Sequence, residues 1–196
     1  MSHALFPAWR PDAGGRESLA AIAARLQAAQ PPDGRRLQPR RPNQWHATLC
    51  FIGYEARQAA TPALLDAFAA VARRIPAHGF KVQRVAYWAQ SGAVVALPHA
   101  SPALQALCDA TRDAIRQCGI RPEQATTQPH VTLAHLPRGL PAQAWLDDID
   151  IDCGGDVMRV DRFELLLNPG GHYEALGDWP LTGGPLPVAP EQPRLL

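Results

Sequence analysis

The sequence is poor in lysine and cysteine, and it has no long apolar run. Lys81 is the one lysine among 19 basic residues, and 18 acidic residues leave a net charge of +1. This balance excludes the general polycation that coats nucleic acid without selectivity. An anionic ligand must therefore be bound locally. Arginine suits forked recognition of phosphate or carboxylate, although genome composition can produce the same bias.

The four cysteines form no Cys-x-x-Cys pair, and no stretch approaches 18 uninterrupted apolar residues. We therefore expect free thiols, neither an export signal nor a membrane span, and a cytoplasmic location. With 196 residues, 46% of them apolar, the chain can form one domain or two small lobes that share a core. We expect a single bilobal domain at 1–182 and a proline-rich tail at 183–196 that is unstructured or draped over the surface.

Short strands alternate with helices along the chain. Helical spacing of apolar residues predicts three helices, of which the last two open with a hydroxyl N-cap followed by proline: RESLAAIAARLQAAQ, TPALLDAFAAVARRI and SPALQALCDATRDAIRQC. β-Branched and aromatic residues predict strands, two pairs of which are hairpins: HALFPAW, WHATLCFIGY, GFKVQRVAYWA with GAVVALPH, QPHVTLAHL, and VMRVDRFELLLN with HYEALGDWPL. The pattern is that of an α+β protein.

The motif His-x-Thr-Leu occurs twice, at His46 and at His130, which lie 84 residues apart. Residues i and i+2 of a strand point to the same face, roughly 6.5 to 7 Å apart. His46 and Thr48 therefore share a face, and so do His130 and Thr132. The repeat predicts two lobes related by a pseudo-twofold axis, with a site at the seam between them.

Two imidazoles and two hydroxyls that converge on one volume suit a phosphate. The hydroxyls can donate to its oxygens, and two histidines can hold opposite protonation states near neutral pH, one as base and one as acid. A single His-x-Thr on a strand is usually ordinary packing, so the duplication carries the argument. There is no HxH, HExxH, P-loop or GxSxG pattern, and we expect neither a metal nor another cofactor.

The segments WHATLCFIG and PHVTLAHLPR resemble the paired signatures of the 2H phosphoesterases. More narrowly, they resemble the RNA 2′,3′-cyclic phosphodiesterases once described as 2′-5′ RNA ligases, and the likeness extends over residues 4–182. It implies a bilobal fold in which two antiparallel sheets with flanking helices surround a central cleft. It also implies metal-independent hydrolysis of an RNA terminal 2′,3′-cyclic phosphate to a 2′-phosphomonoester, with ligation as the reverse reaction.

The same resemblance implies the roles of the motif residues. His130 would accept the proton of the attacking water and His46 would protonate the leaving 3′ oxygen, while Thr48 and Thr132 would bind the phosphate. Because the site is nearly symmetric, the reverse assignment of acid and base stays open. The implied partner is RNA with a 2′,3′-cyclic phosphate end, with no membrane and no obligate protein partner.

One position departs from the family pattern HxTLxR, because His135 replaces its arginine. His135 and Arg138 are candidates for that charge. Strand alternation predicts that His135 points away from the site, however, which favours a structural role for both.

Further candidates for RNA contacts lie outside the two motifs. Tyr173 can stack on a base, whereas Trp45 should pack in the core. The loop ahead of the first motif supplies four candidates for upstream phosphates, which are Arg35, Arg36, Arg40 and Arg41.

Three other interpretations remain open. A 2H enzyme can act on small nucleotide cyclic phosphates or on 2′-5′ oligoadenylates. A protein that only binds RNA ends would use the same residues without turnover, although histidine is a poor anion ligand near neutral pH. A metal hydrolase would lose its activity in EDTA.

Overall fold

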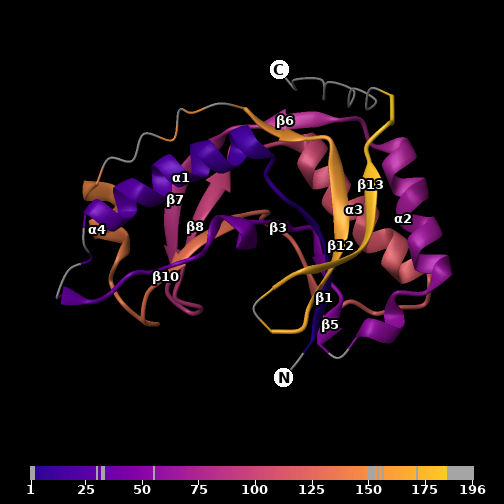
Figure 1. The fold of residues 1–196 in the computed structure, drawn as a ribbon, viewed down its shortest axis with the longest axis horizontal. Coiled ribbons are helices and arrows are strands. Elements are labelled where there is room, and N and C mark those ends of the chain that lie inside the picture. Colours follow the sequence, from indigo (N-terminus) through magenta and orange to yellow (C-terminus); the bar gives the residue numbers. More distant parts are fainter. Residues whose placement is uncertain are drawn as a thin grey trace, which may run out of the picture.

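The computed structural model describes residues 3–29, 31, 34–54, 56–149, 153, 155, 157–170 and 172–184. Most of the tail predicted at 183–196 lies outside this range. The predicted α+β class is confirmed (Figure 1). The helices are α1 (Ala13–Ala28), α2 (Pro62–Arg74), α3 (Pro102–Gln117) and α4 (Gln143–Asp148), with 3-10 turns η2 (Pro42–Gln44) and η3 (Arg57–Ala59).

Nine strands of the described residues form one antiparallel sheet in the order β13-β12-β1-β3-β10-β8-β7, with β5 beside β1 and β2 beside β10. Their bounds are β1 Ala4–Trp9, β2 Gln38–Pro39, β3 Ala47–Thr48, β5 Gly53–Tyr54, β7 Val82–Trp88, β8 Ala93–Pro98, β10 Val131–His135, β12 Arg162–Asn168 and β13 Glu174–Pro180. Two small sheets pair β11 (Met158–Val160) with β6 (His78–Phe80), and β4 (Cys50–Phe51) with β9 (Gln124–Ala125).

The two antiparallel sheets that the resemblance implied are joined edge to edge as the halves of one sheet. One half is β13-β12-β1-β3 and the other is β10-β8-β7, and the pair Val131 with Ala47 joins them. The segment WHATLCFIGY, predicted as one strand, is broken into β3, β4 and β5 because Cys50 and Phe51 turn away to pair with β9. VMRVDRFELLLN likewise divides into β11 and β12. The predicted β7-β8 and β12-β13 hairpins are confirmed.

The helices cover one face of the large sheet. They pack on inward residues of alternating strand positions, such as Leu5, Val94 and Leu165, in one continuous core. Figure 1 shows α1 over β7, β8 and β10, while α2 and α3 lie by β12 and β13. Helix α1, which follows β1, thus covers the β10-β8-β7 half of the sheet. Helix α3, which follows β8, lies by the half that contains β1 and β12. This exchange ties the two halves together.

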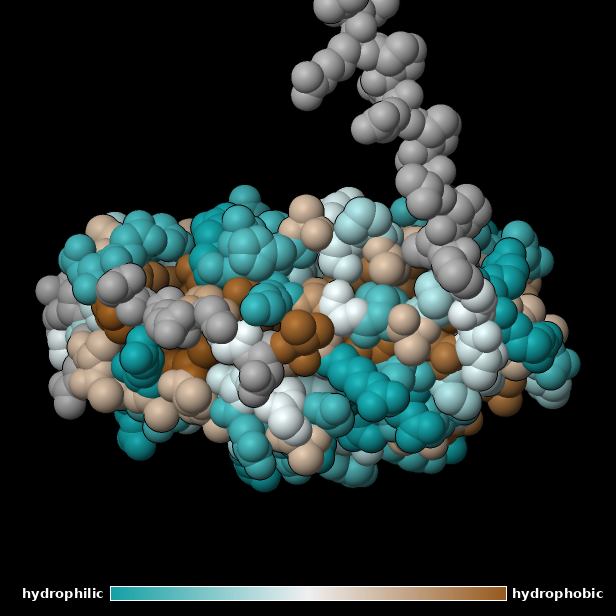
Figure 2. All heavy atoms as spheres, turned by 90° about the horizontal axis from the view of Figure 1, so that it is seen from above, coloured by the Kyte–Doolittle hydropathy of each residue, from teal (hydrophilic) through white to brown (hydrophobic). Residues whose placement is uncertain are grey.

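Local signals set the N-termini of α2 and α3 as predicted, whereas α1 is capped by Asp12 and begins at Ala13, three residues before the predicted start at Arg16. Thr61 and Ser101 accept hydrogen bonds from the backbone N–H of Leu64 and Leu104, both at 3.3 Å, and a proline follows each cap. Helix α3 stops before Gly119, whose φ of +74° suits a residue without a Cβ. No helix of the described residues is long and apolar enough to cross a membrane. The face in Figure 2 has hydrophilic side chains along both rims with apolar ones between them.

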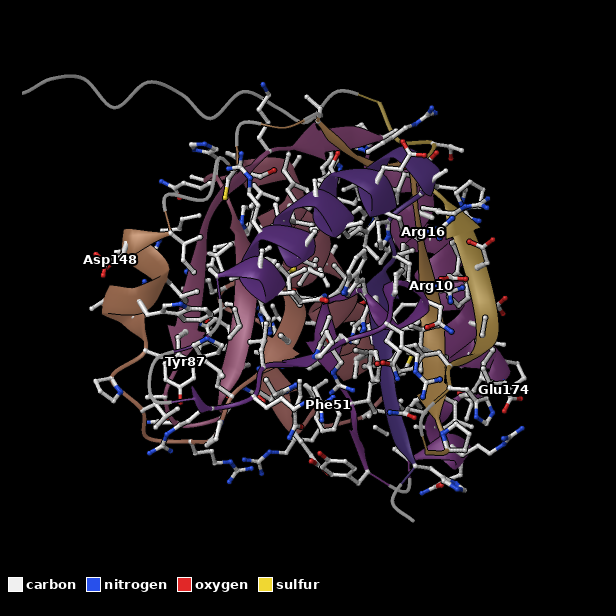
Figure 3. All side chains as sticks on the ribbon, turned by 60° about the vertical axis from the view of Figure 1, so that its left-hand side comes forward. Arg10, Arg16, Phe51, Tyr87, Asp148 and Glu174 are labelled. Carbon is white, nitrogen blue, oxygen red and sulfur yellow. The ribbon has the colours of Figure 1, made fainter. Side chains whose placement is uncertain are left out.

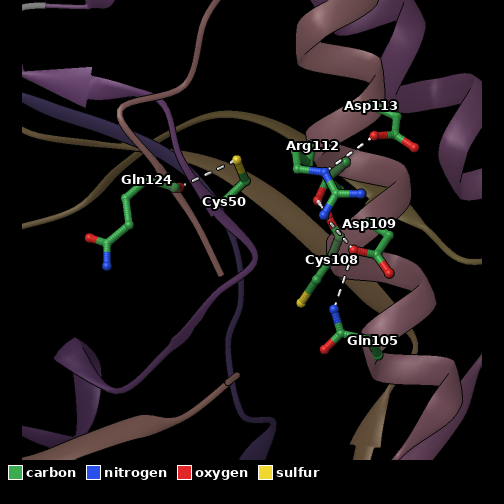
Figure 4. A network of polar contacts seen from close by, with 8 residues as sticks. Cys50, Gln105, Cys108, Asp109, Arg112, Asp113 and Gln124 are labelled. Atoms are coloured by element: carbon green, nitrogen blue, oxygen red, sulfur yellow. Dashed lines mark hydrogen bonds and ion pairs between the residues drawn. The ribbon is translucent and has the colours of Figure 1, made fainter. Parts of the chain in front are cut away.

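None of the four cysteines forms a disulfide, as predicted: Cys50, Cys108, Cys118 and Cys153. Burial raises the pKa of Cys50 to about 11 and that of Cys108 to about 12, so both stay protonated. Figure 4 shows Cys50 donating to the Gln124 carbonyl, at 3.7 Å, next to the ion pairs of Arg112 on α3. Both thiols are therefore structural.

Candidate active site

The four motif residues form a square on the uncovered face of the sheet. Ala47 and Val131 face each other on adjacent antiparallel strands, and both point into the core. When this pairing is extended by one residue in each direction, His46 lies opposite Thr132 and Thr48 lies opposite His130. Directly opposed residues have Cβ atoms about 4.5 to 5.5 Å apart. The two histidines thus occupy diagonal corners, related by the pseudo-twofold axis between β3 and β10.

Backbone carbonyls fix both imidazoles in the same tautomer. Nδ1 of His46 lies 2.8 Å from the Gln44 carbonyl oxygen, and Nδ1 of His130 lies 3.0 Å from that of Gln128. Because a carbonyl only accepts, each Nδ1 carries a hydrogen and donates it. Each Nε2 is then the atom that can take or release a proton.

Aromatic rings hold the imidazoles from the side. Phe6 stacks on His46 with a centroid distance of 5.1 Å, and Tyr173 meets the same ring edge-on at 5.0 Å. Trp88 packs against His130 at 4.2 Å. The Tyr173 ring therefore packs on His46. Sequence reasoning missed Phe6 and Trp88. Strand alternation along β1 places Phe6 on the open face, whereas no local signal points to Trp88.

The threonine side chains are half-buried. Within the described part of the chain, the Thr48 and Thr132 hydroxyls have no hydrogen-bond partner, so both are available to a ligand. A cavity of about 460 Å³ opens beside Thr48 and His130, and Trp88, Phe51 and Tyr54 line it. Its volume lies within the range of small-molecule sites. Two cavities of about 530 Å³ each contain neither motif histidine.

Burial lowers the pKa of both histidines. The pKa of His46 falls to about 4, mainly through loss of hydration, with smaller contributions from the charges of His130, Arg40 and Arg10. The pKa of His130 is lowered by burial too, while its bond to Gln128 opposes this. Both imidazoles are therefore neutral in the unliganded protein at pH 7. A bound phosphate anion would favour protonation of one of them.

Arg10 is a cation near the site that no sequence motif singles out. The β1-β3 register, with Ala8 opposite Thr48 and Trp9 opposite Ala47, sets Arg10 opposite His46 when extended by one residue. Glu164 on β12 holds the Arg10 guanidinium through two hydrogen bonds, of which the Nη2–Oε1 bond is 2.7 Å long. Figure 3 shows Arg10 by β12 and β13, with Arg16 nearby. The Arg10 charge is thus already compensated.

His135 lies on the site face, so the predicted orientation was wrong. A β-bulge shifts the register between β10 and β8: Thr132 pairs with Val95, but Ala134 pairs with Val94 and His135 with Ala93. Leu133 and Ala134 are consecutive, and both are buried in the core. The extra residue reverses the alternation. His135 therefore points to the same side as Thr132.

The other candidates are spread more widely. Trp45 is buried, as predicted. Arg35, Arg36 and Arg41 are exposed, and Arg40 is the loop arginine whose charge reaches His46. Arg138 lies in the exposed turn after β10, which the Tyr87 hydroxyl holds by donating to the Pro137 carbonyl at 2.5 Å. No group of three or more metal-ligating side chains occurs in the described residues.

A duplicated His-x-Thr pair on adjacent strands of an α+β sheet is the arrangement expected of a two-histidine phosphoesterase. Residues 13–171 match the family model of the 2′-5′ RNA ligase superfamily, and the chain belongs to that superfamily, within the 2H phosphoesterases. No curated protein sequence matches the chain.

Three solved structures are similar to this chain. E. coli LigT complexed with 3′-AMP is 21% identical, with a TM-score of 0.65 over 93% of this chain and 99% of its own. TT0787 of Thermus thermophilus is 21% identical, with a TM-score of 0.68 over 92% and 98%. The MHV ns2 PDE domain is 12% identical, with a TM-score of 0.51 over 85% and 97%. These similarities establish the fold.

Loss of hydration at the half-buried His46 makes stability depend on pH. An unfolded histidine has a pKa near 6.5, so between pH 6.5 and 4 the unfolded chain binds a proton that folded His46 does not. The free energy of unfolding should therefore fall as the pH is lowered through this window. Between pH 7.5 and 5, we expect the wild type to lose about 2 kcal/mol more than His46→Gln.

Urea unfolding at the two pH values measures this difference. His99→Gln, at an exposed histidine outside the site, is the matched control. An equal pH dependence in the wild type and His46→Gln would contradict the prediction.

Proposed function

We propose that the protein hydrolyses the terminal 2′,3′-cyclic phosphate of RNA to a 2′-phosphomonoester without a metal ion. The observation that carries this proposal is the square of His46, Thr132, Thr48 and His130, in which both Nε2 atoms are available. The phosphate would lie over the square, bound by the two hydroxyls. Crystals of E. coli LigT with 3′-AMP and with phosphate support a nucleotide phosphate as the ligand.

The proposed reaction is an in-line displacement at phosphorus. His130 takes a proton from water as the new O–P bond forms, and His46 gives a proton to the 3′ oxygen as the P–O3′ bond breaks. The diagonal placement of the histidines supports this division, since attacking and leaving oxygens lie on opposite sides of the phosphorus. Because a 2′,3′-cyclic phosphate requires a ribose 2′ oxygen, DNA ends are excluded as substrates.

The test is a short RNA with a 2′,3′-cyclic phosphate end, incubated with the protein in EDTA. We expect conversion to the 2′-phosphate. An adenosine 2′,3′-cyclic phosphate, an ADP-ribose 1″,2″-cyclic phosphate and a 2′-5′ oligoadenylate complete the panel. The proposal would be refuted if the protein turned over none of the cyclic phosphates, or if its activity required zinc. A preference for the small substrates would instead favour the nucleotide cyclic phosphodiesterase, for which the cavity of about 460 Å³ is large enough.

A further inference from the structure

The arginine-rich loop returns to the same strand edge that it leaves. Strand β2 pairs with β10, and the Arg40 N–H donates to the Leu133 carbonyl at 2.7 Å. The chain then turns outward through η2 and comes back to β10 at Ala47. Arg40 and His46 are therefore the two ends of one short loop, and both lie against β10 within two residues of Thr132.

The turn between these two ends is closed by its own backbone. The Gln44 N–H donates to the Arg41 carbonyl at 2.8 Å, and the Trp45 N–H donates to the Pro42 carbonyl at 3.3 Å. Arg41 thus begins the outward turn, while Arg40 is the last residue still bonded to β10. Two neighbouring arginines of one loop consequently have different places relative to the site.

The bulge in β10 brings a second basic side chain to the same spot. His135 lies on the site face, opposite Ala93 on one side and Gln38 on the other. Gln38 and Arg40 are two residues apart along the β2 segment and share a face. The edge therefore presents Arg40 between His46 and His135.

The charge of Arg40 acts on three groups around this edge. Burial is the main cause of the lowered pKa of His46 and of His135, and the Arg40 charge lowers both further. Burial raises the pKa of Tyr173, and the Arg40 charge opposes this rise. In the described part of the chain, no carboxylate lies within ion-pair distance of Arg40, whereas Glu164 holds Arg10. Arg40 is exposed. Of the two arginines placed beside His46, Arg10 and Arg40, only Arg40 therefore has no carboxylate partner among the described residues.

We propose that Arg40 binds the phosphate under attack and stabilises the charge that develops on its non-bridging oxygens, while the neighbouring Arg41 takes no part. A guanidinium offers paired N–H donors that match two phosphate oxygens. This inference rests on the proposed function for its chemistry, but Arg40 would bind a phosphate whether or not turnover follows. Of the four loop arginines that the sequence offers, this proposal selects Arg40. It also places the Arg40 contact at the reacting phosphate, whereas the sequence alone predicts contacts with upstream phosphates.

The experiment compares Arg40→Ala with Arg41→Ala, the matched control at the adjacent position of the same loop. Binding of adenosine 2′-monophosphate is followed by NMR on the histidine ring protons, and turnover by cleavage of adenosine 2′,3′-cyclic phosphate. For Arg40→Ala we expect at least a roughly tenfold weaker affinity and a roughly 100-fold lower kcat/KM. Millimolar guanidinium should restore part of the activity of this variant. Arg41→Ala should retain the wild-type affinity.

The outcomes separate the two proposals. Equal affinities in the two variants would overturn the role of Arg40, as would an Arg40→Ala defect that guanidinium leaves unchanged. The role would also be overturned if the wild type fails to bind adenosine 2′-monophosphate. If the wild type binds the nucleotide through Arg40 and cleaves no cyclic phosphate, the role of Arg40 stands and the proposed hydrolysis fails.

Discussion

We expect replacement of either His46 or His130 by alanine to lower kcat on the proposed substrate, RNA 2′,3′-cyclic phosphate, by about 10²- to 10⁴-fold, the usual value of a proton-transfer role. Each imidazole has one Nε2 available, and the adjacent corners of the square are threonines, whose hydroxyls are poor acids and bases near neutral pH. Single-turnover cleavage measures the effect. His99→Ala, at an exposed histidine outside the site, is the control. Full activity in either motif variant would contradict the mechanism.

A substrate with sulfur in place of the bridging 3′ oxygen separates the two roles. A thiolate leaves without a proton, so the variant that lacks the proton donor regains activity, and the variant that lacks the acceptor does not. We expect His46→Ala to be rescued. Rescue of His130→Ala in its place would reverse the assignment, which the near symmetry of the site permits.

The second large effect concerns stability, at Gly92 in the β7-β8 hairpin. Its φ is +73°, and an added Cβ would lie 2.2 Å from the Leu136 carbonyl oxygen. The Gly92 carbonyl also accepts the Leu136 N–H at 2.8 Å, which anchors the end of β10. Gly92→Ala should cost about 3 kcal/mol or more, because a backbone conformation penalty and a clash with main chain add together.

Gly139 provides the matched comparison, since its φ is +75° and no atom lies within 4 Å of an added Cβ. Gly139→Ala should cost about 1 to 2 kcal/mol, the conformational penalty alone. Urea unfolding of both variants measures the difference. Similar losses in the two would show that the contact with Leu136 relaxes without cost.

The sequence predicts what depends on neighbouring residues. Helix caps such as Thr61 and Ser101 are local hydrogen bonds, and the common face of His46 and Thr48 follows from strand alternation alone. Membership of the 2H phosphoesterases was open to prediction because the duplicated motif is itself a local pattern. Helix α4 was missed because it is one and a half turns long, has no side-chain N-cap and buries Leu146 alone.

The remainder depends on residues far apart in the sequence. The edge pairing of β3 with β10 is a contact over 84 residues, which no local pattern specifies. The orientation of His135 failed for a related reason: a bulge is defined by the partner strand, and Val94 and Val95 on β8 determine it. The short strand β2, which positions Arg40, is likewise recognisable only from its partner.

A single residue pair, Ala47 with Val131, joins the two halves of the sheet. Each half contributes one motif imidazole, so the distance between His46 and His130 depends on this junction. The core beneath Ala47 and Val131, to which helices from both halves contribute, packs against this junction. We therefore expect the spacing of the two imidazoles to depend on the volume of these two small side chains, which point away from the open face of the sheet.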